Sequence, residues 1–204
     1  MDLENLIQNK QWELLIRNIL PVTISVSIPY NESMRIVAEI WNESPNVEGN
    51  LGLFLCDYAV NLMLVLRERF PEEWGKDWKN EAFLGICCTT VYREEEAFRC
   101  LKSSFDALSD PPQSLVLRLI RIAGPPNAFL EDEERVKLSQ LALEKGITVE
   151  MAETMGDLVH SKEERLYWKK QMKEAEYKHS HTATIVPDCL KNILVTHKDY
   201  PYET

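Results

Sequence analysis

Glycine is scarce in this sequence: only 7 of the 204 residues are glycine, and none follows Asn or Asp. Asn-Gly and Asp-Gly pairs form the usual two-residue turns of β-hairpins, and an all-β domain needs many such turns. The shortage therefore argues against a β-sandwich or a β-barrel. Apolar residues recur instead at helical spacing between proline and glycine stops. We expect an all-α fold of eight to nine helices, arranged as antiparallel helical hairpins or a helical bundle.

Long flexible linkers and low-complexity segments are also missing, so we expect a single helical domain over residues 1–204. At most one or two short segments are β-like. Residues 22–28, V-T-I-S-V-S-I, alternate β-branched and polar positions and predict a strand or an extended linker. Residues 179–186 predict an irregular or β-like segment.

No apolar run is long enough to span a membrane, which takes about 20 residues. The most apolar stretch, residues 51–66, is shorter and contains Asp57 and Asn61. It predicts a central buried helix, and we expect no contact with a membrane. The first residues, M-D-L-E-N-L, carry acids where a secretion signal carries bases, which favours a cytoplasmic protein.

The five cysteines form neither a C-x-x-C pair nor a zinc-binding pattern. Cys56, Cys87, Cys88 and Cys100 lie in apolar helical segments, where a free thiol acts as a small apolar group. We therefore expect five reduced cysteines, four of them buried, and no metal or cofactor.

Known catalytic motifs are absent as well: the sequence has no H-E-x-x-H, G-x-S-x-G, P-loop or G-x-G-x-x-G. Asp57 and Asn61 are nevertheless a candidate site. They are polar residues in an otherwise apolar helix, and a spacing of four places both on one face of it. With Arg67, Arg69 or a helix N-terminus as a partner, the two residues would form a buried structural polar network. A helix face that meets solvent is the other structural interpretation. An enzyme of unrecognised type, with a histidine brought near Asp57 and Asn61 by folding, is the alternative.

The sequence has fewer basic than acidic residues: 23 Lys and Arg compared with 33 Asp and Glu, which gives a net charge of −10. Such a surface repels phosphate backbones, so we expect no nucleic-acid partner. It favours encounter with a basic protein, although acidity also serves solubility alone. Acidic clusters and two tryptophans beside the polar loop 71–79 supply the candidate partner-binding residues. These are Glu94, Glu95, Glu96, Glu131, Asp132, Glu133, Glu134, Trp74 and Trp78.

Residues 80–112 have the layout of two short helices followed by a proline stop. Leu84-Gly85 is followed by Ala97, then Leu101, and the segment closes on Pro111-Pro112. The segment resembles one tetratricopeptide-type repeat, whose period is about 34 residues. The resemblance implies an antiparallel hairpin in which Gly85 and Ala97 face each other, and a binding scaffold.

These features together favour a protein that binds another protein without catalysis. In its general character, compact, acidic and without catalytic motifs, the chain resembles bacterial toxin-immunity proteins, which act as inhibitors. An adaptor or a secretion chaperone has the same character. The sequence indicates neither the partner nor the oligomeric state.

Overall fold

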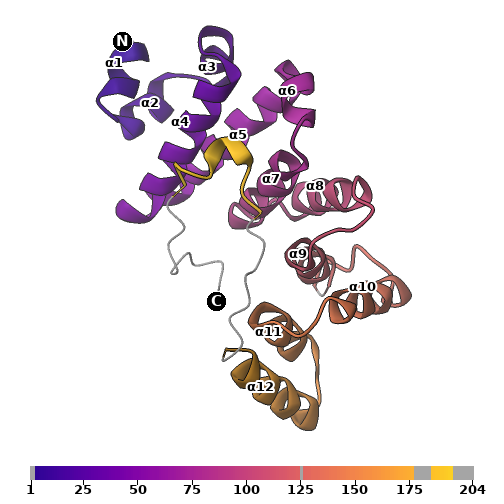
Figure 1. Ribbon diagram of the computed structural model, residues 1–204. Helices are drawn as coiled ribbons and strands as arrows, with labels where there is room; N and C mark the ends of the chain where they lie inside the picture. The colour runs from indigo at the N-terminus through magenta and orange to yellow at the C-terminus, as the bar shows by residue number, and fades with distance from the viewer. Residues whose placement is uncertain (1–2, 125, 177–184, 195–204) are drawn as a thin grey trace. The chain divides into compact units, whose positions relative to one another are not determined.

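The computed structural model describes residues 3–124, 126–176 and 185–194. Helices account for 76% of them, and these residues form no strand, which confirms the all-α prediction (Figure 1). The contacts between residues divide the chain into two compact units. Unit 1 comprises Met1–Ala97 with Val186–Thr204, and unit 2 comprises Phe98–Ile185. The single helical domain expected over residues 1–204 stays a prediction.

The described residues form 12 α-helices and two short 3-10 helices, where the sequence predicted eight to nine helices. Unit 1 holds α1 (Leu3–Gln8), α2 (Trp12–Asn18), α3 (Pro21–Ser27), α4 (Tyr30–Glu43), η1 (Ser44–Asn46), α5 (Leu51–Arg69), α6 (Pro71–Gly75), α7 (Trp78–Thr90) and η2 (Asp188–Leu190). The boundary between the units falls within α8 (Glu94–Asp106). Unit 2 continues with α9 (Gln113–Ala123), α10 (Asp132–Glu144), α11 (Val149–Leu158) and α12 (Lys162–Glu176).

The additional helices have local causes. Apolar residues recur at helical spacing over residues 2–20, which predicts one helix, but the φ of 52° at Lys10 separates α1 from α2. Residues 22–28 were predicted as a strand or an extended linker, and this prediction is wrong, because most of them belong to α3. Pro21 supplies the φ of a first helical position, and Ile24 is fully buried one turn later. The expected loop 71–79 likewise contains α6, which also begins with proline.

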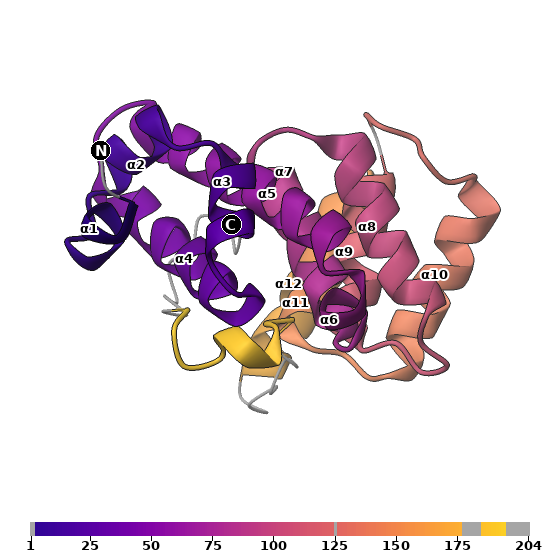
Figure 2. The ribbon, with the colours of Figure 1, turned by 90° about the horizontal axis from the view of Figure 1, so that it is seen from above.

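Helix α5 is the core of unit 1, as the apolar stretch predicted. It contacts α2, α3, α4, α6 and α7 (Figure 2). Its residues Leu55, Leu62 and Leu66 are buried. At Gly52 it passes so close to η1 that a Cβ would lie 2.4 Å from the carbonyl oxygen of Ser44. No helix among the described residues is long and apolar enough to cross a membrane.

The last described segment of the chain packs on α4 of unit 1 through η2. The backbone N–H of Asp188 donates to Asp77 Oδ2 at 2.9 Å, and Lys79 Nζ donates to Asp188 Oδ1 at 2.7 Å. Farther along, Asn42 Nδ2 donates to the carbonyl oxygen of Ile193. Unit 1 is therefore built from both ends of the chain.

In unit 2, helices that are near one another along the chain pack together: α9 contacts α10 and α11, and α11 contacts α12. Gln113 joins three helices, because its Nε2 donates to the carbonyl oxygens of Ala142 and Gly146 at 2.7 and 2.6 Å. Its Oε1 accepts from the hydroxyl of Thr148, which caps α11 by accepting from the N–H of Met151. These bonds satisfy backbone groups that helix ends leave unpaired.

Candidate functional site

Asp57 and Asn61 lie one turn apart on α5, as their spacing predicted. Asn61 Nδ2 donates to Asp57 Oδ2 at 3.0 Å. Arg93 Nη2 donates to Asp57 Oδ1 at 2.6 Å and to Asn61 Oδ1 at 2.9 Å. The Asp57 side chain is 43% exposed, so it is not the buried carboxylate that an apolar helix suggested. Each carboxylate oxygen of Asp57 accepts a hydrogen bond, and the three side chains form a closed polar group.

Arg93 reaches α5 because of the turn that ends α7. Tyr92 has a φ of 59°, and the N–H of Arg93 donates back to the carbonyl oxygen of Cys88 at 3.0 Å. This is the hydrogen-bond pattern of a Schellman motif, in which the left-handed position usually holds glycine. The turn places the Arg93 guanidinium against the α5 face that carries Asp57.

A second arginine extends these contacts into a network. Arg67 Nη1 lies 3.0 Å from Glu81 Oε1, and Arg67 Nη2 lies 3.6 Å from Glu96 Oε1. Arg93 Nη1 lies 3.9 Å from Glu96 Oε2, and the indole N–H of Trp74 donates to Glu81 Oε2 at 2.7 Å. Side chains from α5, α6, α7 and α8 are therefore joined within unit 1. We call this set, together with Asp57 and Asn61, the polar network.

The thiol of Cys88 lies beside the polar network. Burial, and next the charge of Glu96, raise the pKa of Cys88 to about 12. Burial also raises the pKa of Cys87 and Cys56. A thiol with a raised pKa does not supply the thiolate that nucleophilic or redox chemistry needs. All five cysteines are free, and Cys56, Cys87, Cys88 and Cys100 are buried, as predicted.

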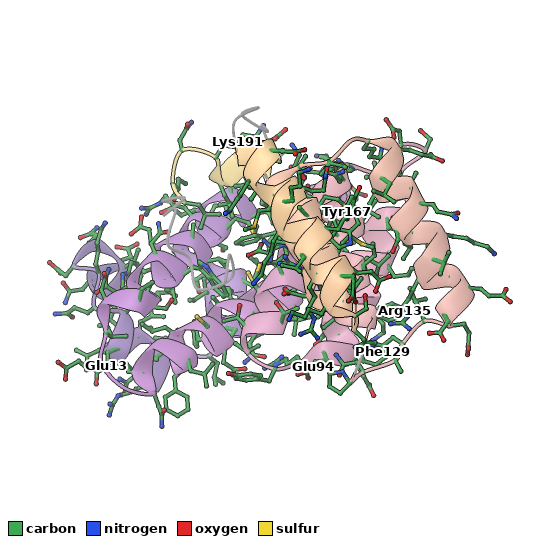
Figure 3. All side chains as sticks on the ribbon, turned by 90° about the horizontal axis from the view of Figure 1, so that it is seen from below. Glu13, Glu94, Phe129, Arg135, Tyr167 and Lys191 are labelled. Carbon is green, nitrogen blue, oxygen red and sulfur yellow. The ribbon has the colours of Figure 1, made fainter. Side chains whose placement is uncertain are left out.

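The acidic residues that were predicted to bind a partner fall into two groups. Glu94, Glu95 and Glu96 form the first turn of α8 in unit 1, where negative charge is stabilised by the helix dipole. Glu95 is exposed, Glu94 is half-buried (labelled in Figure 3), and Glu96 belongs to the polar network. Glu68, Glu72 and Glu73 are also exposed in unit 1, on the end of α5 and on α6.

The second group, Glu131 to Glu134, precedes and begins α10 in unit 2, and all four side chains are exposed. Asp132 pairs with Arg135 one turn later in the same helix. The two predicted acidic clusters therefore belong to different units, and each is considered by itself.

The two tryptophans that were predicted to bind a partner differ in their exposure. Trp74 is only 5% exposed, and its one polar atom is bonded to Glu81. Trp74 therefore belongs to the core of unit 1 and offers little surface to a partner. Trp78, at the start of α7, is half-buried and remains a candidate.

Among the described residues, no group of three or more His, Cys, Asp or Glu is arranged to hold a metal ion. His160 is exposed at the end of α11. His179, His181 and His197 lie outside the described residues, and the enzyme alternative, which needs a histidine near Asp57, stays a prediction.

Sequence reasoning missed the partner of Asp57. It suggested Arg67 or Arg69, which are close in sequence, whereas Arg93 is 36 positions away. The only sequence signal for Arg93 was its place in the hairpin of residues 80–112, whose first helix packs on α5. Compared with family models, with curated proteins and with solved structures, the chain matches none.

Proposed function

We propose that this protein binds a basic protein partner, without catalysis, through an acidic surface of unit 1. We define the acidic surface as Glu68, Glu72, Glu73, Glu94, Glu95 and Glu96. The proposed partner is a toxin or an enzyme. Binding blocks the activity of the partner, so that this protein acts as an immunity protein or an inhibitor.

The distribution of charge carries the proposal. Unit 1 contains 19 Asp and Glu against 10 Lys and Arg, whereas unit 2 contains 14 against 13. Nine of the ten net negative charges therefore belong to unit 1. A field of one sign steers a partner of the opposite sign and speeds association.

The polar network supports the proposal by fixing the elements that carry the acidic surface. The chain of contacts from Trp74 through Glu81 and Arg67 to Glu96 links α6, which bears Glu72 and Glu73, to the first turn of α8. Binding groups on elements held in this way lose less conformational freedom when a partner binds. With Asp57, Asn61 and Arg93 bonded to one another, these residues serve the scaffold in this proposal.

The test begins with affinity capture from the native cell and identification of the partner by mass spectrometry. Association and dissociation rates are then measured at low and high salt. Reversing the charge in the variants Glu72→Lys/Glu73→Lys and Glu94→Lys/Glu95→Lys should slow association about tenfold or more at low salt, and little at high salt. Dissociation should change less, because steering acts on the encounter.

The control variant is Glu43→Lys/Glu48→Lys, which changes the net charge equally but lies outside the acidic surface. It should affect association less than either test pair. An acidic partner, or association that is indifferent to salt and to all reversals, contradicts the proposal. Turnover of a small molecule that is lost on Asp57→Asn would replace it with the enzyme alternative.

A further inference from the structure

Helix α12 turns a basic face to solvent. It packs on α11, and its residues Trp168 and Ala175 are buried. At 3.6 residues per turn, the residues opposite this buried side form one line along the helix. They are all exposed, and we call them the α12 stripe: Lys162, Leu166, Lys169, Lys170 and Lys173. Four lysines therefore surround Leu166, which is 58% exposed.

Helix α10 presents a face of the opposite charge. Its residues Leu138 and Ala142 are buried, and α10 contacts α9. The residues on the opposite side are exposed, and Val136 and Leu143 among them are 55% and 39% exposed. We call this face the α10 stripe: Asp132, Glu133, Val136, Leu143 and Glu144.

The two stripes are complementary in kind. Each places exposed apolar side chains among charges mainly of one sign, basic on α12 and acidic on α10, the arrangement by which helices select partners across an interface. On α10, the exposed Lys137 lies beside Glu133 and Glu144, and the exposed Gln140 lies between the acidic residues. Both belong to unit 2, which carries one net negative charge. Figure 3 shows the two helices from below, with Tyr167 labelled on α12 and Arg135 on α10.

We propose that two copies of this chain associate through unit 2, with the α12 stripe of each copy packed on the α10 stripe of the other. In the proposed dimer the two copies are related by a two-fold axis, so that each contact forms twice and no stripe is left open. Leu166 then meets Val136 and Leu143, and Lys169 and Lys173 meet Glu133 and Glu144. The proposal concerns unit 2 and is independent of the acidic surface of unit 1.

A second copy fits these observations better than a nucleic acid does. Glu163 and Glu174 border the α12 stripe, and Glu174 lies 3.8 Å from Lys170, so the positive surface is narrow. A phosphate backbone has no apolar group to place on Leu166. A second copy brings acids and apolar side chains together, and through unit 2 it approaches with little net repulsion.

The test is a charge exchange measured by sedimentation velocity of the full chain over a range of concentrations. One variant reverses the α12 stripe (Lys169→Glu/Lys173→Glu), and another reverses the α10 stripe (Glu133→Lys/Glu144→Lys). The parent should approach twice the monomer mass as concentration rises, and each variant alone should stay monomeric. An equimolar mixture of the two variants should form a dimer again, because both of its contacts then pair opposite charges.

Two controls accompany the exchange. Far-UV circular dichroism and melting should show that both variants are folded. Glu48→Lys/Asp157→Lys, which matches the α10 variant in net charge but leaves both stripes intact, should dimerise like the parent. A parent that stays monomeric at all concentrations overturns the proposal, as does a mixture that stays monomeric while the parent dimerises. A monomeric parent that binds a single-stranded DNA oligonucleotide through Lys169 and Lys173 assigns the α12 stripe to nucleic acid and also overturns it.

Discussion

Arg93 holds three side chains of unit 1, because it contacts Asp57 and Asn61 on α5 and Glu96 on α8. We predict that Arg93→Ala lowers the free energy of unfolding by about 1–2 kcal/mol, since it leaves a half-exposed carboxylate and amide without their cationic partner. Urea unfolding followed by circular dichroism measures the change.

Arg17→Ala is the matched control for Arg93→Ala. Arg17 pairs with Glu13 on the surface of α2, with both side chains more than half exposed. Pairs of this kind contribute about 0.3–0.5 kcal/mol, so Arg17→Ala should have a smaller effect. Equal losses in the two variants would show that the polar network adds nothing to an ordinary surface ion pair.

Residue roles were predictable from sequence when the interacting groups lie within one helical turn. Threonine is a common N-cap residue, and the hydroxyl of Thr148 accepts from the N–H of Met151 at the start of α11. Ser161 and Glu164 have the spacing of a capping box, and the Ser161 hydroxyl accepts from the N–H of Glu164. The Glu164 carboxylate accepts from the Ser161 hydroxyl rather than from its backbone N–H.

At the scale of elements, proline and glycine marked the helix ends well. Helix α10 ends before Gly146, whose φ of 98° suits glycine. The strand predicted over residues 22–28 is wrong because β-branched residues at alternate positions are only a local preference. Burial of Ile24 and Ser25 after Pro21 favours the helix instead.

The hairpin of α7 and α8 carries a prediction of its own. Ala97 is fully buried on α8, and Gly85 is buried on α7. The expectation that they face each other stays a prediction. Ala97→Leu adds three carbon atoms to a filled site and should destabilise the protein by about 1–3 kcal/mol.

Thermal unfolding of Ala97→Leu measures this cost. Ala107→Leu is the control, because Ala107 is exposed just beyond α8 and should tolerate the larger side chain. If Ala97→Leu melts at the same temperature as the parent, the neighbouring helices have room for the leucine side chain. The close helix crossing implied by the tetratricopeptide resemblance would then be wrong.

At the scale of the whole molecule, the net charge could be counted from the sequence, but its distribution between the two units could not be predicted. Unit 1 takes its residues from both ends of the chain, and the boundary lies inside α8, where no linker composition marks it. Long-range contacts decide this division. The acidic surface and the complementary stripes of α10 and α12 could be recognised only once the helix faces were known.

The return of the chain to unit 1 should depend on pH through Asp188. Hydrogen bonds from Lys191 and Lys79 lower the pKa of Asp188 from 3.8 to about 2. Because the pKa is lower in the folded state, the stabilisation is complete above the unfolded value of about 4 and is lost as the pH falls toward 2. Asp188→Asn removes it at every pH. We therefore predict that the parent has a higher melting temperature than Asp188→Asn at pH 5–7, and that this difference disappears near pH 2.

Melting curves of both proteins between pH 2 and pH 7 measure the difference in melting temperature, with Asp157→Asn on the surface of α11 as the control. A difference that persists unchanged at pH 2 would show that Asp188 stabilises the segment through something other than its charge.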